Sequence, residues 1–326
     1  MKRIILKSMM AAMVVTLSLN AKADEYEYGV QINSISYNLN KSSKTATVTY
    51  NYDNNYSGAI NIPKSIVYNS INYLVTSIGD MAFRNCSSLI SVNIPNSVVK
   101  IGFCAFEGCN GLTSMTIPND VTSIGNNAFY GCCSLTSVTI PNNVVNIGDF
   151  AFANCWGLTS ITIPKSVTSI GNKAFNACSG LTSIVVEYGN PVYDSRENCN
   201  AIIETSSSTL IRGCDNTIIP DGIRSICSAA FSACRNLTSL IIPTSVTSIG
   251  EEAFINCSAL ISVTIPYGIT CIPQNVFFGC SGLKSVIIPN SVKSISNDAF
   301  HNAGLTSIKI PDGITTIGSF AFCNCI

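Results

Sequence analysis

LTSITIPKSVTSIGNKAFNACSG, residues 158–180, is the stretch that decides the fold, because close copies of it lie on both sides at a fixed offset. A proline ends the I-P step of each copy, and successive prolines are 23 residues apart within two blocks. They are Pro95, Pro118, Pro141 and Pro164, then Pro220, Pro243, Pro266 and Pro289, with Pro311 following after 22 residues. This period is too short for paired helices and predicts small coils that stack into a solenoid.

Each copy divides into four short pieces. Residues 158–163 alternate apolar and hydroxyl side chains, which predicts a strand, and Pro164 ends the strand because proline has no N–H for the ladder. Residues 167–170 form a second, shorter extended piece, which Gly171 ends. Residues 172–178 place Ala, Phe and Cys at the spacing of one inward helical turn. The predicted fold is an α/β solenoid of stacked 23-residue coils, each with a parallel strand, a turn, a short second strand and a short helical turn.

Residues 1–23 have the pattern of a secretory signal peptide. Basic residues precede a short apolar run at 9–19, and Ala21-Lys22-Ala23 fits a cleavage site. We expect a mature chain that begins at Asp24 and is exported to the cell surface or the extracellular space. A retained N-terminal anchor is the alternative. No later segment has eighteen uninterrupted apolar residues, so no membrane-spanning segment is expected once the signal is removed.

The rest of the chain divides into a cap and a solenoid. Residues 24–73 lack the repeat and are predicted to form a β-rich N-terminal cap, because a first coil without one would expose an apolar face and a sheet edge. An independent binding module is the alternative for this stretch. Residues 74–326 are predicted to be the solenoid, with an irregular longer coil at 187–219. Two short strands at 201–204 and 209–212 predict a hairpin within that coil.

The recurring string L-T-S-(I/V)-x-I-P-x-(S/G)-(V/I)-T-S-I-G-x-x-A-F-x-x-C resembles the BspA-like leucine-rich repeats of bacterial surface proteins. Matching pieces are LTSVTIPNNVVNIGDFAFANC at 135–155 and LTSITIPKSVTSIGNKAFNAC at 158–178. The resemblance covers roughly residues 56–326. It implies a leucine-rich-repeat arc on a surface-attached or extracellular protein that binds host matrix or mediates adhesion, with no catalytic residues. The C-terminal part of many such proteins is absent here, which leaves the mode of attachment open.

The net charge and the few residues capable of acid-base chemistry argue against nucleic-acid binding, membrane binding and catalysis. The net charge is zero and only 11% of residues are charged, so neither nucleic acid nor an anionic membrane is expected as a partner. His301 is the single histidine and is expected to be a solvated surface residue, which leaves no Ser-His-acid or Cys-His site. Glu251 and Glu252 are expected on a solvated turn. We therefore predict a protein that is not an enzyme and that binds no cofactor.

Sixteen cysteines in a chain with a signal peptide would suggest disulfides by count alone. Nine of them instead occupy one inward column of the repeat, where parallel side chains point the same way, so we predict buried free thiols there. The column is Cys86, Cys109, Cys132, Cys155, Cys178, Cys234, Cys257, Cys280 and Cys325. Cys199 and Cys214 flank the predicted hairpin and are a possible disulfide, with free thiols as the alternative. No recurring two-cysteine knuckle indicates a zinc site, and no other metal site is expected.

Two features are candidates for binding. The first is a pair of hydroxyl columns on the outward strand face, whose alternative explanation is strand propensity with tight stacking; an ice-binding array is disfavoured because such sheets curve. Its residues are Ser114, Thr116, Ser137, Thr139, Ser160 and Thr162. The second is Tyr188, Tyr193 and Arg196 in the irregular coil, because aromatic residues and Arg are enriched in binding hot spots. Here the alternative is a structural variation of the coil.

The sequence therefore leaves two functions open. One is an exported recognition or adhesion scaffold that binds a host or matrix protein, or a glycan, through a repeat face and the irregular coil. The other is a structural cell-surface element that self-associates through its C-terminal end. The last copy stops at Ile326 inside its final turn, so this end either pairs with another chain or belongs to a fragment.

Overall fold

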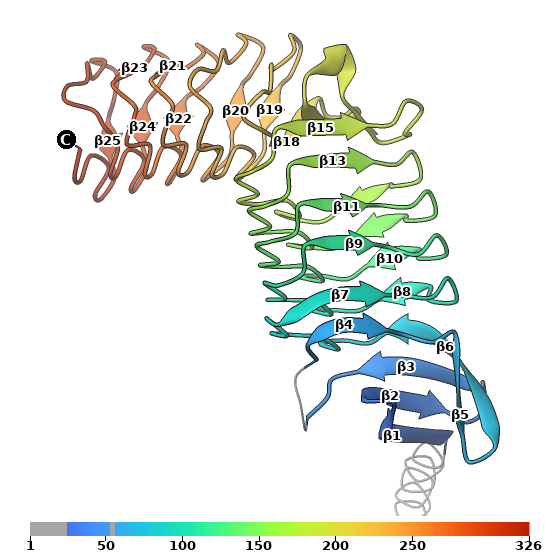
Figure 1. Ribbon diagram of the computed structural model, residues 1–326. Coiled ribbons are helices and arrows are strands. Elements are labelled where there is room, and N and C mark those ends of the chain that lie inside the picture. The colour runs from blue at the N-terminus through green and yellow to red at the C-terminus, as the bar shows by residue number, and fades with distance from the viewer. Residues whose placement is uncertain (1–24, 53–55, 326) are drawn as a thin grey trace, which may run out of the picture.

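The computed structural model describes residues 25–52 and 56–325. The predicted signal peptide at 1–23 and the C-terminal residue Ile326 lie outside the described residues. The chain forms an elongated stack of coils that changes direction once (Figure 1). We call residues 76–186 the first arm and residues 219–325 the second arm.

The N-terminal strands form a sheet that runs into the solenoid. β1 pairs antiparallel with β2, and β2 with β3. β3 then pairs in parallel with β6, and β6 with the first short strand of the first arm. The strands are β1 (Tyr26–Ile32), β2 (Ile35–Asn40), β3 (Thr45–Thr49), β4 (Gly58–Asn61), β5 (Ser65–Tyr68) and β6 (Ile71–Ile78). Antiparallel strands therefore cover the edge that the first parallel coil would otherwise expose.

The first arm consists of two rows of parallel strands. The row from the LTSITI pieces is β7 (Leu89–Asn93), β9 (Ser114–Thr116), β11 (Ser137–Thr139), β13 (Ser160–Ile163) and β15 (Ser183–Val186). The row from the TSI pieces is β8 (Lys100–Ile101), β10 (Ser123–Ile124), β12 (Asn146–Ile147) and β14 (Ser169–Ile170). Equivalent residues stack in register, as Ser137 on Ser114 and Thr139 on Thr116. The repeat period therefore becomes a set of side-chain columns.

The second arm repeats this plan with shorter strands. They are β19 (Ser225–Ile226), β20 (Ser248–Ile249), β21 (Ser262–Thr264), β22 (Cys271–Ile272), β23 (Ser285–Ile287), β24 (Ser294–Ile295) and β25 (Thr316–Ile317). Between the arms lie β16 (Tyr193–Asp194), the 3-10 turn η1 (Arg196–Asn198), β17 (Ala201–Glu204) and β18 (Thr209–Gly213). β17 and β18 pair antiparallel, so the hairpin expected from the sequence is present.

The hairpin β17–β18 is a wall between two hydrophobic cores. Ile202 packs in the core of the first arm, whereas its neighbours Ala201 and Ile203 pack in the core of the second arm. All three side chains are buried. Because alternate residues of a strand point to opposite faces, one strand can close both arms at once. The stack turns at this wall, and the second arm runs across the direction of the first (Figure 1).

The segment from the I-G step to the column cysteine, which we call the turn segment, is not the helical turn expected from residues 172–178. Two residues of it, four apart, adopt left-handed φ, such as Lys173 (52°) and Ala177 (53°). Its alternate N–H groups donate to the next coil, as Phe152 N to Ala174 O at 2.8 Å. A helix would direct those N–H groups back along its own chain, so stacking favours a series of tight turns instead.

Phenylalanines of the A-F step form two ring stacks inside the arms. In the first arm the centroids of neighbouring rings lie 4.9–5.5 Å apart, from Phe83 to Phe175. In the second arm they lie 5.2–5.5 Å apart, from Phe231 to Phe322. The hairpin separates the two stacks, and Gly213 lies against the ring of Phe231 at that break.

Candidate binding surfaces

The hydroxyl columns of the first arm lie on its solvent-facing strand surface. The predicted residues Ser114, Thr116, Ser137, Thr139, Ser160 and Thr162 are all exposed. Within the described residues, none of these six hydroxyls hydrogen-bonds to another protein group. The neighbouring threonines behave differently, because Thr136 Oγ1 donates to Thr113 O at 3.0 Å and so ties adjacent coils together. The six candidates therefore form a regular, exposed polar surface.

This surface does not continue unchanged into the second arm. Ile241 and Ile287 take the position that threonine holds in β9, β11 and β13, and they are 85% and 60% exposed. A shallow cavity of about 300 Å³ lies beside Ile241 and Ser262. The strand face is thus hydroxylic on one arm and partly apolar on the other, so it is not one uniform array.

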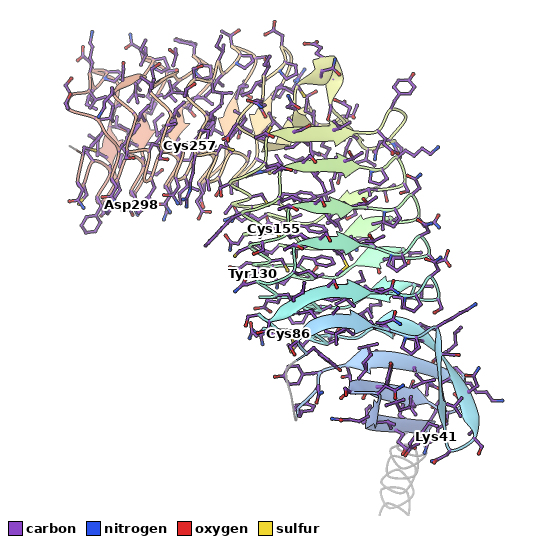
Figure 2. The ribbon with its side chains drawn as sticks, viewed as in Figure 1. Lys41, Cys86, Tyr130, Cys155, Cys257 and Asp298 are labelled. Carbon is purple, nitrogen blue, oxygen red and sulfur yellow. The ribbon has the colours of Figure 1, made fainter. Side chains whose placement is uncertain are left out.

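The turn segments of both arms form a different kind of surface, which we call the turn face. Its charged groups pair between coils: Arg84 Nε lies 2.9 Å from Glu107 Oε2, and Lys173 pairs with Glu252 at 2.5 Å. The second pair joins the two arms across the bend. Figure 2 places Tyr130 of the first arm and Asp298 of the second on the inner side of the bend. The turn face therefore lines the concave side of the molecule.

At its N-terminal end the turn face is hollowed into a cleft of about 300 Å³. Tyr50, Tyr52, Met81 and Arg84 are among the residues that line the cleft. The rings of Tyr50 and Tyr52 meet edge-to-face with centroids 5.1 Å apart. Further along the same face Phe103 is 40% exposed and Tyr130 is half-buried. Aromatic and arginine side chains thus gather on one concave surface.

The sequence pattern did not identify this surface as a candidate. Arg84, Tyr130 and His301 occupy one repeat position, and of these only His301 had an expected role, that of a solvated surface residue. His301 Nδ1 in fact lies 2.7 Å from Asp298 Oδ1, and its ring centroid lies 4.9 Å from that of Phe278. Glu252 is likewise ion-paired rather than simply solvated. The signal that could have found the turn face is variation between coils, because this position changes chemistry in every coil while the strand columns barely change.

The irregular coil does not present its three candidates together. Tyr188 is fully exposed, but Tyr193 is only 6% exposed. The Tyr193 hydroxyl oxygen accepts a hydrogen bond from Ile170 N at 3.0 Å, and burial raises its pKa. Arg196 donates two hydrogen bonds to the Asp194 carboxylate. Burial alone would raise the pKa of Asp194, but hydrogen bonds from Arg196 and Thr205 bring it below its usual value. Of the three candidates, only Tyr188 is therefore fully exposed, whereas Tyr193 is buried and Arg196 is partly exposed and ion-paired.

All sixteen cysteines are free thiols. In seven of the nine column positions the thiol donates to the main-chain oxygen of the phenylalanine of the preceding coil, as Cys132 to Phe106 O at 3.1 Å. The other such thiols are those of Cys109, Cys155, Cys178, Cys257, Cys280 and Cys325. Each of these carbonyls also accepts a main-chain N–H from its own coil, as Phe106 O does from Cys109 N at 3.2 Å, so the thiol adds a second, weak hydrogen bond that links adjacent coils.

The possible disulfide between Cys199 and Cys214 is not formed. β17 and β18 pair Ala201 with Gly213, which sets the two cysteines out of register by one residue. That offset sends the side chains to opposite faces of the hairpin, so Cys199 packs in the core of the second arm and Cys214 in the core of the first. A hairpin disulfide requires side chains on the same face.

Thiol reactivity should follow this burial. Burial raises the pKa of Cys132 to about 12, and that of Cys155 well above its usual value. Cys271 is the one exposed cysteine of the described chain. With excess iodoacetamide at pH 8, we expect Cys271 to be alkylated on the order of 100-fold faster than these column thiols. Peptide mass spectrometry over time measures the rates. If Cys271 and the column thiols were alkylated at equal rates in the folded protein, the burial of the column would be contradicted.

The described residues contain no cluster of His, Cys, Asp and Glu that could hold a metal ion. They also contain no helix long and apolar enough to cross a membrane. The surfaces that remain for function are the strand face, the turn face and Tyr188.

Comparisons with known proteins agree with the repeat architecture. Residues 76–199 and 210–326 match the family described as BspA type leucine rich repeat region, in six copies. A leucine-rich cell surface protein of Faecalibacterium prausnitzii is 33% identical, with 91% of this chain and 92% of that chain covered and a TM-score of 0.69. A leucine-rich repeat protein of Bacteroides ovatus is 27% identical, with 92% and 93% covered and a TM-score of 0.59.

The pneumococcal vaccine antigen PcpA shares the fold, with a TM-score of 0.69 at 20% identity over 92% of this chain and 80% of that chain. No match is found among the curated proteins. The family match extends over most of the chain. The cysteine column, the two rows of strands and the stacked phenylalanine rings of the A-F step give the match a structural basis. The chain belongs to the BspA-type leucine-rich repeat family.

Proposed function

We propose that this protein is an exported, non-enzymatic recognition scaffold that binds an extracellular protein through the turn face of its first arm. The observation that carries the proposal is the uneven distribution of chemistry over the molecule. The strand face repeats the same two hydroxyl residues, whereas the turn face presents Arg84, Phe103 and Tyr130 in three successive coils beside a cleft.

The kind of partner follows from those side chains. Arginine and large aromatic residues dominate the binding energy of protein interfaces, particularly at concave, well-packed centres. Solenoids commonly use their extended concave surfaces for binding. A protein partner is therefore favoured over a glycan. The family relationship and the cell surface relative from Faecalibacterium prausnitzii support a location outside the cell. The predicted signal peptide at 1–23 is consistent with that location.

A binding screen tests the proposal. The chain from Asp24 to Ile326 is measured against immobilised extracellular-matrix proteins and glycans by biolayer interferometry. For a protein that binds, the variant Arg84→Ala/Phe103→Ser/Tyr130→Ser should bind about 30-fold more weakly or worse, because hot-spot residues each contribute on the order of 2 kcal/mol or more.

The matched control changes three residues of the strand face instead, Thr116→Ala/Thr139→Ala/Thr162→Ala, and should bind like the wild type. Tyr188→Ala tests the remaining exposed candidate of the irregular coil. Loss of binding in the strand-face variant but not in the turn-face variant would place the ligand on the hydroxyl columns and reject the proposal. Light scattering on the same samples separates binding from self-association, because self-association makes the measured mass grow with concentration.

A further inference from the structure

The junction between the arms contains an arginine whose charge has no partner. Arg212, in β18, is 3% exposed. Its Nη1 and Nη2 groups donate to Ser232 O at 3.2 Å, and Nη1 also donates to Ala229 O at 3.2 Å. Its Nε is buried without a hydrogen-bond partner. No carboxylate of the described residues forms an ion pair with it.

The position of Arg212 explains its carbonyl contacts. In a regular coil, Ser232 O would accept from the N–H of a preceding coil, but the hairpin has displaced that coil. Arg212 supplies the missing donors, and Gly213 N supplies another to Ala230 O at 2.9 Å. The side chain therefore caps the first coil of the second arm. The carbonyl oxygens partly stabilise the guanidinium charge, but no carboxylate of the described residues balances it.

The last coil of the first arm, on the other side of the junction, has main-chain N–H groups without acceptors. In the coil before it, Phe150 N and Phe152 N donate to Asn172 O and Ala174 O. The equivalent groups, Lys173 N and Phe175 N, have no next coil to receive them and form no hydrogen bond in the described structure. By the repeat, these N–H groups point along the stack toward the hairpin. Donors without acceptors thus lie on the first-arm side of the junction.

A cavity of about 110 Å³ lies between these two sets of donors. Lys173, Phe175, Asn176 and Arg212 line it, and Ala174 and Ile211 add apolar wall. Asn176 Oδ1 is also buried without a hydrogen-bond partner. Lys173 is already neutralised by Glu252, so the net charge at the cavity is that of Arg212.

The nearby thiols do not neutralise Arg212. Burial raises the pKa of Cys178 to about 11, and the charge of Arg212 only partly opposes this effect. Burial likewise raises the pKa of Cys234 to about 12 against the same opposing charge. Both thiols stay protonated at neutral pH, so neither of them supplies a counter-charge to Arg212.

We propose that this cavity binds a small monovalent carboxylate, held by the guanidinium group of Arg212, which lines the cavity, and by the main-chain N–H groups of Lys173 and Phe175. One carboxylate provides two oxygens that accept several N–H donors, and its single charge matches the single uncompensated guanidinium. The ring of Phe175 and the side chain of Ile211 suit a short apolar tail. A phosphate dianion would bring excess charge into an apolar site, and chloride would leave the apolar wall without contact. The bound anion would join the two arms at the bend.

Isothermal titration calorimetry of the chain from Asp24 to Ile326 with propionate, in a chloride-free buffer at constant ionic strength, tests the proposal. We expect saturable binding at one site, with binding of phosphate and chloride about tenfold weaker or more. The substitution Arg212→Gln should abolish the heat of propionate binding. The control Arg224→Gln, which changes an exposed arginine of the second arm, should leave it unchanged. Absence of saturable binding in the wild type, or equal binding by Arg212→Gln, would overturn the proposal.

A second measurement covers the case in which Arg212→Gln does not fold. In a crystal structure of the wild type grown with propionate, the proposal requires density for a carboxylate in the cavity, within hydrogen-bonding distance of the Arg212 guanidinium. Ordered water alone in the cavity would overturn it. Propionate should also raise the melting temperature of the wild type, because a ligand that binds only the folded state stabilises it.

Discussion

Phe152→Ala is expected to lower the free energy of unfolding by about 3–5 kcal/mol, the usual cost of removing a fully buried aromatic side chain. Phe152 has no exposed surface, and its ring lies between those of Phe129 at 5.1 Å and Phe175 at 5.5 Å. The coils cannot close around the missing ring, because their spacing is fixed by strand and turn hydrogen bonds on all sides. The cavity therefore remains, and the stack of the first arm is cut in the middle.

Phe150→Ala is the matched control, because it makes the same chemical change two residues away in the same turn segment. Phe150 is half-buried and belongs to no ring stack, so its replacement should change stability by about 1 kcal/mol or less. Urea unfolding followed by circular dichroism gives both values. Hydrogen exchange should show the extra opening of Phe152→Ala concentrated in the coils next to it, since repeat proteins are stabilised by nearest neighbours. Equal effects of the two substitutions would contradict the ring stack as a source of stability.

Gly213→Ala is expected to destabilise the protein by about 1–3 kcal/mol, in the range of overpacked cores. A Cβ atom at this position would lie 2.3 Å from Cε1 of Phe231 and 2.7 Å from its Cζ. The ring cannot move away easily, because Phe254 stacks on it with centroids 5.2 Å apart. The added methyl group therefore strains the hairpin wall and the first ring of the second arm together.

A double-mutant cycle with Phe231→Leu tests that mechanism. The smaller side chain removes the ring atoms that the new methyl group would meet. Gly213→Ala should therefore cost at least about 1 kcal/mol less in the Phe231→Leu background than in the wild type. Thermal or urea unfolding of the four proteins measures the coupling. Strict additivity would show that the cost of Gly213→Ala arises elsewhere, for example from the hairpin backbone.

Much of the fold could be predicted from residues 158–180 and their copies. The strand, the proline stop and the inward Ala, Phe and Cys recur at one offset, so contacts between neighbouring coils repeat with them. The hairpin at 201–204 and 209–212 was also recognisable, because its strands alternate around a polar turn. Eight of the nine column thiols are buried and free, as the same logic predicts, whereas Cys325 in the last coil is only partly buried.

The candidate sites were less predictable. The hydroxyl columns are exposed as expected, because alternation in a strand directly determines which side chains face solvent. Tyr193 and Arg196 looked equivalent to Tyr188 in the sequence, yet one is buried against Ile170 and the other is paired to Asp194. The turn face could not be predicted from a single coil, because the pairs Arg84–Glu107 and Lys173–Glu252 form between coils.

The sequence by itself determined the period, the parallel stacking and the inward columns, because those interactions join residues at a constant separation of one coil. Only the tertiary structure decided the features that depend on other separations. Stacking hydrogen bonds between coils replaced the expected helical turn, and the hairpin register sent Cys199 and Cys214 into different cores. The pair of Lys173 with Glu252, 79 residues apart, and the isolated charge of Arg212 exist because the stack bends at the hairpin. A bend brings together groups whose separation in the sequence follows no repeat, so no pattern within the coils could indicate them.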